Sequence, residues 1–311
     1  MAFHRFSSKM DISIIIATHN RAHLFRRTLE SFEKLCTDGI EWELFVVDNA
    51  SNDNGETEKL LKEYESKLPM TVLSEPTPGK NRALNKAILL AKGSLFVFTD
   101  NDIIADTMWI SSYWDAFLRW PSADIFGGRI QPLFPAKTPE YLLGDDFLFR
   151  GMSFSEYLPK VSEGEPANIP MGPNMAIRAT VFQQYSYLES IGPSGKQYPM
   201  GSETELIRRL INDGKKYVYV PASRVEHIIE AHQVTEQWLL QRAFRFGWGR
   251  SFYITKTKKS IGGIPFYVLR KAMSAWILYY VSFFVTKGKK ISRGMRLNML
   301  WGTIYGLRTK R

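Results

Sequence analysis

The chain has 311 residues, of which 44% are hydrophobic and 14% aromatic, which excludes general disorder and allows one large domain or a domain with an appendage. The single cysteine, Cys36, excludes an intrachain disulfide and a Cys/His zinc site around it, so we expect a reducing compartment. The polar start MAFHRFSSKMD lacks the hydrophobic region of a signal peptide, so we expect a cytoplasmic protein.

The net charge of +10 is unevenly distributed. Residues 237–311 contain 16 Lys or Arg and no Asp or Glu, whereas residues 1–236 contain 25 basic and 31 acidic side chains, a net charge of −6. A mildly acidic body is therefore joined to a strongly basic tail, which indicates an anionic partner for the tail, either a membrane or a nucleic acid.

Strand and helix patterns alternate through the first 100 residues. Apolar runs predict strands at residues 12–17, 44–47, 71–73 and 95–99, and apolar residues at helical spacing predict helices at 24–35, 57–68 and 83–91. Because the strands lack a polar face, this order predicts a doubly wound α/β domain, with a mostly parallel sheet and helices on both faces. Ligands of such sheets lie at the carboxyl ends of the strands.

The second half has a different character. Proline and glycine cluster between residues 132 and 173, which is typical of a loop-rich insertion that shapes a substrate site. Further strands are predicted at residues 174–177 and 217–220. Further helices are predicted from Ser202 and from about Val234.

Carboxylates follow the fourth predicted strand in the stretch FVFTDND, at Asp100 and Asp102. A turn or a helix cap would explain them without any ligand. The first strand, however, lacks the glycine-rich turn of a dinucleotide-binding fold, and no P-loop motif is present. A phosphate-bearing ligand would therefore need another counter-charge, and Mn²⁺ or Mg²⁺ held by the two aspartates would supply it.

Five segments in this order resemble glycosyltransferase family 2, whose members have the GT-A fold: ISIIIATHNRAHLFRRTLESF, ELFVVDNASND, GKNRALNKAILLAKGSLFVFTDND, GPNMAIR and GSETELIRRL. The resemblance covers nearly residues 11–250. It implies a metal-dependent, inverting transfer of a sugar from a nucleotide-sugar donor. Two positions depart from the commonest family pattern, because Ala17 replaces a proline and His19 a tyrosine, and neither change removes a group that takes part in the chemistry.

The resemblance also implies roles for individual residues near the nucleotide. Asp100-Asn101-Asp102 matches the D-x-D motif, so Asp100 and Asp102 would bind the metal, with Asp100 also at the nucleotide. Thr18 and Asp48 match positions that contact the nucleobase. For Asp48 the alternative is a turn or cap residue.

Two arginines match positions close to these residues. Arg21 lies beside the nucleobase-contacting positions, and the alternative is a solvated arginine at the start of a helix. Arg82 matches a basic position near the nucleotide.

Transfer to a hydroxyl group needs a general base, and the candidates lie in the sequence GSETEL. Ser202 and Glu205 have the spacing of a capping box, which would engage Glu205 at the start of a helix. Glu203 is then left to project, so we expect Glu203 to be the catalytic base, with Glu205 as the alternative. The family often has an aspartate at the position of Glu203.

Three further predictions concern the donor and acceptor half. The family has a histidine at the position of His227, which would approach the metal and the diphosphate; a structural histidine is the alternative. Asn174 is expected beside the donor sugar or the acceptor, together with Glu205, and a turn at a strand edge is the alternative for Asn174. Trp109 and Trp114 are expected in the core rather than as sugar platforms.

The predicted organisation is a catalytic domain at residues 1–256, with a nucleotide-binding half (1–105) and an acceptor half (106–256), followed by a basic helical tail (257–311). The predicted function is transfer of a hexose, from a UDP-sugar, to a glycan or lipid-linked acceptor in polysaccharide or cell-envelope synthesis. A non-catalytic scaffold is the alternative. Nucleic-acid binding through the tail is not expected, because the body contains no recognisable nucleic-acid-binding module.

The tail is expected to lie on the inner face of the cytoplasmic membrane without crossing it. Its longest uncharged stretch, residues 272–286, has 15 residues, and a spanning helix needs about 20. Basic residues flank this stretch and aromatic residues suit the headgroup boundary: Lys256, Lys258, Lys259, Lys287, Lys289, Lys290, Arg293 and Arg296, with Trp276, Tyr279, Tyr280 and Trp301. The alternative is a pair of helices that pack on the catalytic domain.

Overall fold

The computed structural model describes residues 10–144, 146–164, 169–195, 197–254 and 259–309. The chain divides into two compact units. The first, here the sheet unit, comprises Met1–Gln131, Tyr157–Tyr187 and Leu206–His227; the second, here the helical unit, comprises Pro132–Glu156, Leu188–Glu205 and Ile228–Arg311. Neither unit ends at residue 256, where the domain boundary was expected. That boundary stays a prediction.

Eight strands form one sheet in the order β3-β2-β1-β4-β7-β6-β8-β5. Its parallel part confirms the alternation predicted from the first 100 residues, and it consists of β1 (Ile12–Thr18), α1 (Ala22–Phe32), β2 (Trp42–Asp48), α2 (Glu56–Tyr64), β3 (Met70–Ser74), α3 (Lys80–Ile88) and β4 (Leu95–Phe98). In the register of β1 and β2, Thr18 lies beside Asp48, so the two strands end together.

The remaining strands continue the sheet beyond β4. They are β7 (Met175–Arg178), β6 (Ile125–Leu133), β8 (Tyr217–Ile228) and β5 (Ile103–Ala105). β7 runs antiparallel to β4 and to β6, and β5 runs antiparallel to β8. β7 and the first part of β8 match predicted strands, whereas β5 and β6 are additions to them.

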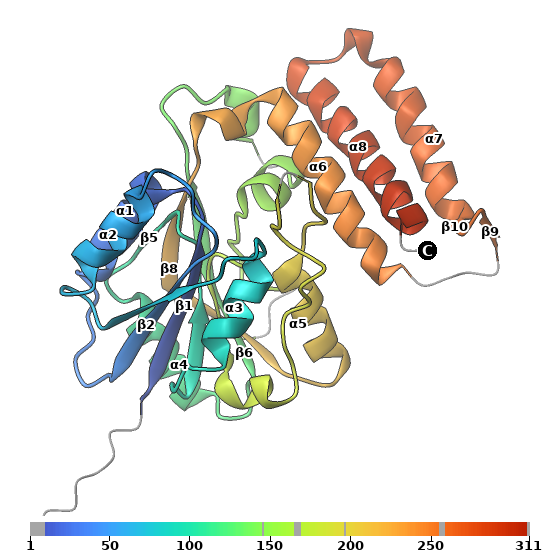
Figure 1. Cartoon of the computed structure of the whole chain (residues 1–311). Helices are drawn as coiled ribbons and strands as arrows, with labels where there is room; N and C mark the ends of the chain where they lie inside the picture. Colours follow the sequence, from blue (N-terminus) through green and yellow to red (C-terminus); the bar gives the residue numbers. More distant parts are fainter. Residues whose placement is uncertain (1–9, 145, 165–168, 196, 255–258, 310–311) are drawn as a thin grey trace, which may run out of the picture. The chain divides into compact units, whose positions relative to one another are not determined.

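Helices cover both faces of the sheet, as the continuous apolar strands predict (Figure 1). On one face, Ile14, Val46 and Val97 pack against α1, α2 and α4 (Trp109–Arg119). On the other face, Ile15, Phe45 and neighbouring side chains pack against α3 and the part of α5 (Ser202–Asn212) that belongs to the sheet unit. Trp109 is fully buried, which confirms its predicted place in the core. The sheet unit also contains the short helix η3 (Ala179–Gln183).

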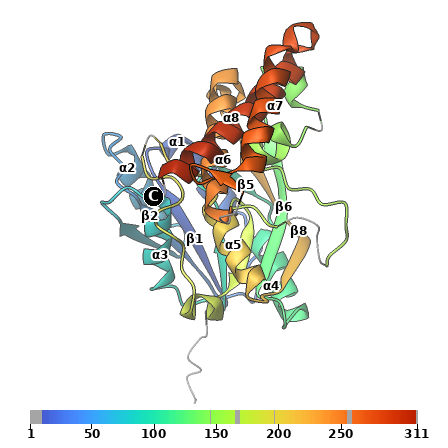
Figure 2. The same cartoon turned by 90° about the vertical axis from the view of Figure 1, so that its right-hand side faces the viewer.

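The helical unit is built around three long helices (Figure 2): α6 (Glu236–Arg250), α7 (Phe266–Tyr280) and α8 (Lys287–Thr309). Its shorter elements are η1 (Glu140–Leu142), η2 (Leu148–Ser153), η4 (Ala231–Val234), η5 (Ser251–Tyr253), β9 (Ser260–Ile261), β10 (Ile264–Pro265) and η6 (Ser282–Phe284). α6 begins two residues after the expected start, and the Thr235 hydroxyl caps it by accepting from the backbone N–H of Trp238.

Glycines allow α6 and α8 to approach closely. A methyl group at Gly247 of α6 would collide with the carbonyl of Met299, and one at Gly302 of α8 would collide with the carbonyl of Phe244. Around these contacts, Leu239 and Ala243 of α6 share an apolar core with residues of α8. α8 belongs to the predicted tail and α6 to the predicted catalytic domain. Their contact agrees with the alternative expectation, in which the helices of the tail pack on that domain.

None of the helices in the described part of the chain is both long and apolar enough to cross a membrane. Among the basic residues expected to flank the uncharged stretch, Lys256 and Lys258 lie outside the described residues.

Candidate active site

Polar residues lie at the carboxyl ends of three neighbouring parallel strands of the sheet unit. Thr18 ends β1, Asp48 ends β2, and Asp100 and Asp102 come directly after β4. Because β4 and β2 both pair with β1, these residues lie along one edge of the sheet. The structure thus brings together the residues that the sequence places at strand ends.

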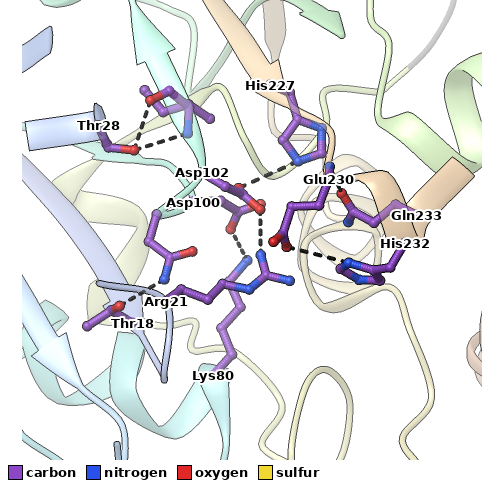
Figure 3. A network of polar contacts seen from close by, with 12 residues as sticks. Thr18, Arg21, Thr28, Lys80, Asp100, Asp102, His227, Glu230, His232 and Gln233 are labelled. Carbon is purple, nitrogen blue, oxygen red and sulfur yellow. Dashed lines mark hydrogen bonds and ion pairs between the residues drawn. The ribbon is translucent and has the colours of Figure 1, made fainter. Parts of the chain in front are cut away.

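Each of the two aspartates forms an ion pair with a cation from elsewhere in the sheet unit (Figure 3). Nζ of Lys80 lies 2.6 Å from Oδ1 of Asp100, and Nη1 of Arg21 lies 2.6 Å from Oδ2 of Asp102. Nε2 of His227 lies 3.5 Å from the other carboxylate oxygen of Asp102, Oδ1. Two carboxylates and three nitrogen-bearing side chains therefore form one charge network.

Hydrogen bonds fix the backbone around this network. Ile103 is paired with His227 in the register of β5 and β8, which brings the histidine beside the loop that follows β4. The hydroxyl of Thr28 donates to the carbonyl of Ile103 at 2.8 Å and accepts from its N–H at 3.1 Å. The amide of Asn101 donates to the hydroxyl of Thr18 at 2.8 Å, which ties this loop to the end of β1.

Asp102 is buried as a charged group, with 4% of its surface exposed. Burial by itself would raise the pKa of Asp102, but the charge of His227, followed by those of Arg21 and Lys80, outweighs burial and lowers the pKa of this carboxyl to about 2. Oδ1 of Asp102 is nevertheless buried without a hydrogen-bond partner. The charged neighbour of this oxygen is Nε2 of His227, at 3.5 Å.

The aspartates fit a divalent cation whose other ligands come from the substrate or from water. Mg²⁺ and Mn²⁺ bind through one or two protein carboxylates together with phosphate oxygens. Within the described ranges, no three His, Cys, Asp or Glu side chains converge as a complete protein ligand set. The expected third ligand, His227, contacts Asp102 and stays a prediction.

Asn49, which follows β2, is a structural centre of this edge to which the sequence assigned no role. Its side chain is buried, donates to the carbonyls of Glu75 at 3.0 Å and Thr77 at 2.8 Å, and accepts from the N–H of Gly79 at 2.7 Å. Its backbone N–H donates to the carbonyl of Thr18 at 2.8 Å. Asn49 therefore holds the loop before α3 against the ends of β1 and β2.

Lys80 was also missed by the sequence reasoning, which singled out Arg82 from the same segment. Lys80 is the first residue of α3, and its pairing with Asp100 places it within the network. Arg82 is exposed on the same helix. Gly79 was the signal that could have identified Lys80. A basic residue directly after this glycine begins a helix at the sheet edge that carries the carboxylates.

Thr18 and Asp48, the residues predicted to contact the nucleobase, differ in burial and in their hydrogen bonds. Thr18 is buried and holds Asn101, whereas Asp48 is half-buried. Oδ1 of Asp48 accepts from the N–H of Ser51 at 3.2 Å, so this side chain also has the turn-stabilising contact that the alternative expects.

Asn174 does not have the surface that a sugar contact requires. Its side chain is fully buried, and its oxygen accepts from Nε1 of Trp109 at 2.8 Å and from the hydroxyl of Tyr113 at 2.7 Å. Its amide nitrogen donates to the carbonyls of Arg129 at 3.0 Å and Ser223 at 3.1 Å. All four hydrogen-bonding positions are used within the sheet unit. We therefore withdraw the expected sugar contact and assign Asn174 a positioning role.

The two candidate bases lie at the start of α5, in the part that belongs to the helical unit. The helix begins at Ser202, the residue predicted as its cap. Glu203 is half-buried, whereas Glu205 is buried with 8% exposure, and its N–H donates to the carbonyl of Gly201 at 2.9 Å. In the same unit, Glu230 closes a capping box with Gln233, and its carboxylate lies 3.9 Å from Nδ1 of the exposed His232 (Figure 3).

Known proteins of similar sequence are glycosyltransferases. The glucosyl-dolichyl phosphate glucuronosyltransferase of Haloferax volcanii is 23% identical over 254 residues, which are 78% of this chain and 76% of the relative. The pre-mycofactocin glycosyltransferase of Mycobacterium tuberculosis is 22% identical over 302 residues, which are 93% of this chain and 59% of the relative.

Solved structures show the same fold. The mannosyltransferase PcManGT from Pyrobaculum calidifontis, solved in complex with GDP-Man and Mn²⁺, superposes with a TM-score of 0.63 at 16% identity, covering 98% of this chain and 89% of that chain. Staphylococcus aureus TarS 1–349 superposes with a TM-score of 0.54 at 16% identity, covering 97% and 92% of the two chains. The expected α/β class and GT-A fold are thereby confirmed.

The family model described as Glycosyl transferase family 2 matches residues 13–186. This range includes the ends of β1, β2 and β4 with Asp100 and Asp102, but it does not include His227 of β8. This match spans more than half of the chain. The chain therefore belongs to glycosyltransferase family 2 and is an enzyme of the glycosyltransferase type.

Proposed function

We propose that this enzyme transfers a sugar from a nucleotide-sugar donor, with inversion and with the help of Mn²⁺ or Mg²⁺, to a hydroxyl of a glycan or lipid-linked acceptor. The observation that carries this proposal is the pair Asp100 and Asp102 at the sheet edge, after the end of β4 and beside Lys80 and Arg21. The complex of PcManGT with GDP-Man and Mn²⁺ supports a donor and a metal of these classes. We expect UDP as the nucleotide here, and GDP is the comparison that a test must include.

Asp100 and Asp102 would hold the divalent ion, which supplies counter-charge to the departing diphosphate. Lys80 and Arg21 form ion pairs with these carboxylates at 2.6 Å each. Both cations are also suited to phosphate oxygens, Arg21 through its planar fork and Lys80 as a point charge. We therefore assign Lys80 and Arg21 a second partner, the diphosphate of the donor, for which they leave the carboxylates.

The nucleotide is expected at the ends of β1 and β2, with Thr18 and Asp48 at the base and Arg82 nearby. Asn49 supports this region, because it holds the loop of residues 75–79 that leads into α3 and Lys80. Asn49 is thus a positioning residue rather than a ligand contact.

Glu203 is proposed as the general base that takes the proton of the acceptor hydroxyl as its oxygen attacks the anomeric carbon. The family motif GSETEL and the half-buried state of Glu203 at the first turn of α5 support this role. Glu205 is buried and is the alternative. His227, whose Nε2 lies 3.5 Å from Oδ1 of Asp102, is proposed to approach the metal and the diphosphate.

The C-terminal helices are proposed to bind the inner face of the cytoplasmic membrane without crossing it. α7 exposes large apolar and aromatic side chains, among them Phe266, Met273, Trp276, Ile277 and Tyr280. The acid-free sequence of residues 237–311 adds positive charge to this surface. Apolar burial and attraction to anionic lipids act together at such surfaces.

A hydrolysis screen over a panel of UDP- and GDP-sugars, with and without Mn²⁺ or Mg²⁺, tests the transferase proposal. We expect slow, metal-dependent release of the nucleoside diphosphate from one donor, because water can replace the acceptor hydroxyl. The substitution Asp102→Asn should abolish this release. Hydrolysis that ignores both chelator and substitution would contradict the proposed metal site.

A further inference from the structure

A groove of about 570 Å³ lies within the helical unit and is lined by residues of α6, α7 and α8. We call it the α7–α8 groove. Five cationic side chains contribute to its wall: Arg250, Arg270, Lys271, Arg293 and Arg296. Apolar side chains form much of the remainder, including Ile254, Val268, Leu278, Met299 and Leu300. Its volume lies in the range of sites that bind small molecules.

The cations of the groove have no carboxylate partners among the described residues. Arg293 donates to the carbonyl of Leu278 at 3.1 Å and to the hydroxyl of Ser282 at 2.8 Å, which are neutral groups. Asp146 contacts α8, but its carboxylate accepts from the hydroxyl of Ser292 at 2.7 Å. No acidic residue occurs in residues 237–311.

Gathering five like charges in one groove is unfavourable unless an anion offsets their repulsion. Four of the five are arginines, whose fork of N–H groups matches phosphate oxygens. Because apolar side chains of α7 and α8 also line the groove, a free inorganic anion would leave that part of the lining without a partner. The lining therefore fits a molecule with a phosphate at one end and hydrocarbon at the other.

The surface around the groove indicates where such a molecule would come from. Met273, Trp276, Ile277 and Tyr280 of α7 are about half exposed or more, and Tyr267 beside the groove is 42% exposed. An apolar and aromatic helix face next to a cationic groove matches the boundary between lipid headgroups and acyl chains.

We propose that the α7–α8 groove binds one anionic phospholipid, with the phosphate among Arg270, Arg296 and the other cations and the first part of the acyl chains against the apolar side chains of the lining. The inference rests on the proposed membrane association, because it names the lipid class and the site through which that association becomes specific. It differs from a diffuse charge effect, because it assigns the binding to particular cations.

The full-length chain provides the test with two double variants of equal charge change. Arg270→Gln with Arg296→Gln removes two exposed groove cations, and Lys289→Gln with Lys290→Gln removes two exposed cations of α8 that do not line the groove. Arg293 is left intact because it holds α8 to the end of α7. Thermal unfolding checks that both variants keep the fold.

Calorimetry with dihexanoyl phosphatidylglycerol below its micelle concentration measures the groove itself. Dihexanoyl phosphatidylcholine, glycerol phosphate and inorganic phosphate are the comparison probes, and vesicles with and without phosphatidylglycerol measure membrane association. We expect one bound phosphatidylglycerol per wild-type chain and weaker binding of the other probes. The groove variant should lose affinity by about tenfold or more, because charge-assisted hydrogen bonds are lost, while the control stays near wild type.

Three results would overturn the inference in distinguishable ways. Equal losses in the two double variants would show a diffuse charge effect, and inorganic phosphate binding as tightly as phosphatidylglycerol would show a site for the free anion. In both cases vesicle binding by the wild type would leave the membrane association standing. If the wild-type chain does not bind anionic vesicles, both the proposed membrane association and the proposed lipid site in the groove are wrong.

Discussion

The charge network of Asp100 and Asp102 in the sheet unit differs from the α7–α8 groove of the helical unit in how its cations are paired. In the network, Lys80 and Arg21 each lie 2.6 Å from a carboxylate of Asp100 or Asp102. In the groove, five cations belong to the lining without an ion pair in the described part of the chain. The first arrangement is neutralised internally, and the second depends on an anion from outside.

The difference indicates two kinds of binding. A site whose cations already have partners binds a ligand by exchanging those partners, so the ligand must bring both an anion and a cation. A nucleotide sugar with a divalent ion meets that requirement. A site with unpaired cations binds an anion directly, and its affinity is sensitive to salt.

The largest expected effect comes from Glu203, which is proposed to accept the proton and belongs neither to the charge network nor to the groove. Glu203→Gln keeps the size of the side chain but cannot accept a proton, so transfer should fall by about 10²- to 10⁴-fold. Metal-dependent nucleotide binding should stay near wild type, because Glu203 belongs to neither cluster. Steady-state kinetics together with calorimetry measures both quantities. Glu205→Gln is the matched control, and a larger loss there would move the base to Glu205.

Asp102→Asn breaks the network at its most buried member. The substitution leaves Arg21 and His227 beside a neutral group, so the free energy of unfolding should fall by about 1–3 kcal/mol. Turnover should fall as well, because the diphosphate loses its counter-charge. Chemical denaturation and donor hydrolysis measure the two losses. Excess Mn²⁺ that restores the wild-type rate and affinity would argue against direct ligation by Asp102.

Asn49→Ala tests whether the network depends on its backbone support. The variant leaves the N–H of Gly79 without its acceptor and frees the loop of residues 75–79, so we expect a loss of about 1–3 kcal/mol in the free energy of unfolding. Nucleotide affinity should fall while the metal dependence of binding remains. Asn52→Ala, at an exposed position of the following loop, is the control. A variant with unchanged nucleotide affinity would confine Asn49 to stability.

Lys80→Gln gives the smallest effect and the sharpest test of partner exchange. With Lys80 gone, Asp100 loses its internal cation, so Mn²⁺ should bind the nucleotide-free protein about tenfold more tightly. The dependence of Mn²⁺ affinity on UDP should shrink by a similar factor. Electron paramagnetic resonance of free Mn²⁺ measures both values without turnover. Lys86→Gln removes the same charge from α3 and is the control, because the amine of Lys86 donates to the carbonyl of Ser74 at 2.7 Å. Unchanged or weaker Mn²⁺ binding in Lys80→Gln would contradict the exchange.

The sequence predicts the parallel part of the fold well, because its strands are continuously apolar and its helices carry regular apolar spacing. β1, β2, β3 and β4 appear at the expected places. β5 and β6 were not predicted. β5 has three residues, which is too short for a periodic signal, and β6 contains the glycine pair Gly127-Gly128 and a proline, which mask a strand pattern.

For the site, strand ends and motif spacing identify the carboxylates, but they do not show which cations reach them. Lys80 and Arg82 look alike in the sequence, and only α3 places Lys80 at Asp100. Asn174 shows the reverse error. Its motif indicates a functional residue, but its four hydrogen bonds come from residues distant in the chain and belong to the core.

The proposed metal-assisted binding of the nucleotide at Asp102 can be measured by calorimetric titration of UDP, with and without Mn²⁺, into wild type and Asp102→Asn, with GDP as the comparison nucleotide. Mn²⁺ should strengthen nucleotide binding to the wild type by about tenfold or more, within the usual range of coupling between two ligands. The variant should lose most of this gain. Nucleotide binding that is tight, independent of Mn²⁺ and unchanged in Asp102→Asn would contradict a metal site at Asp102.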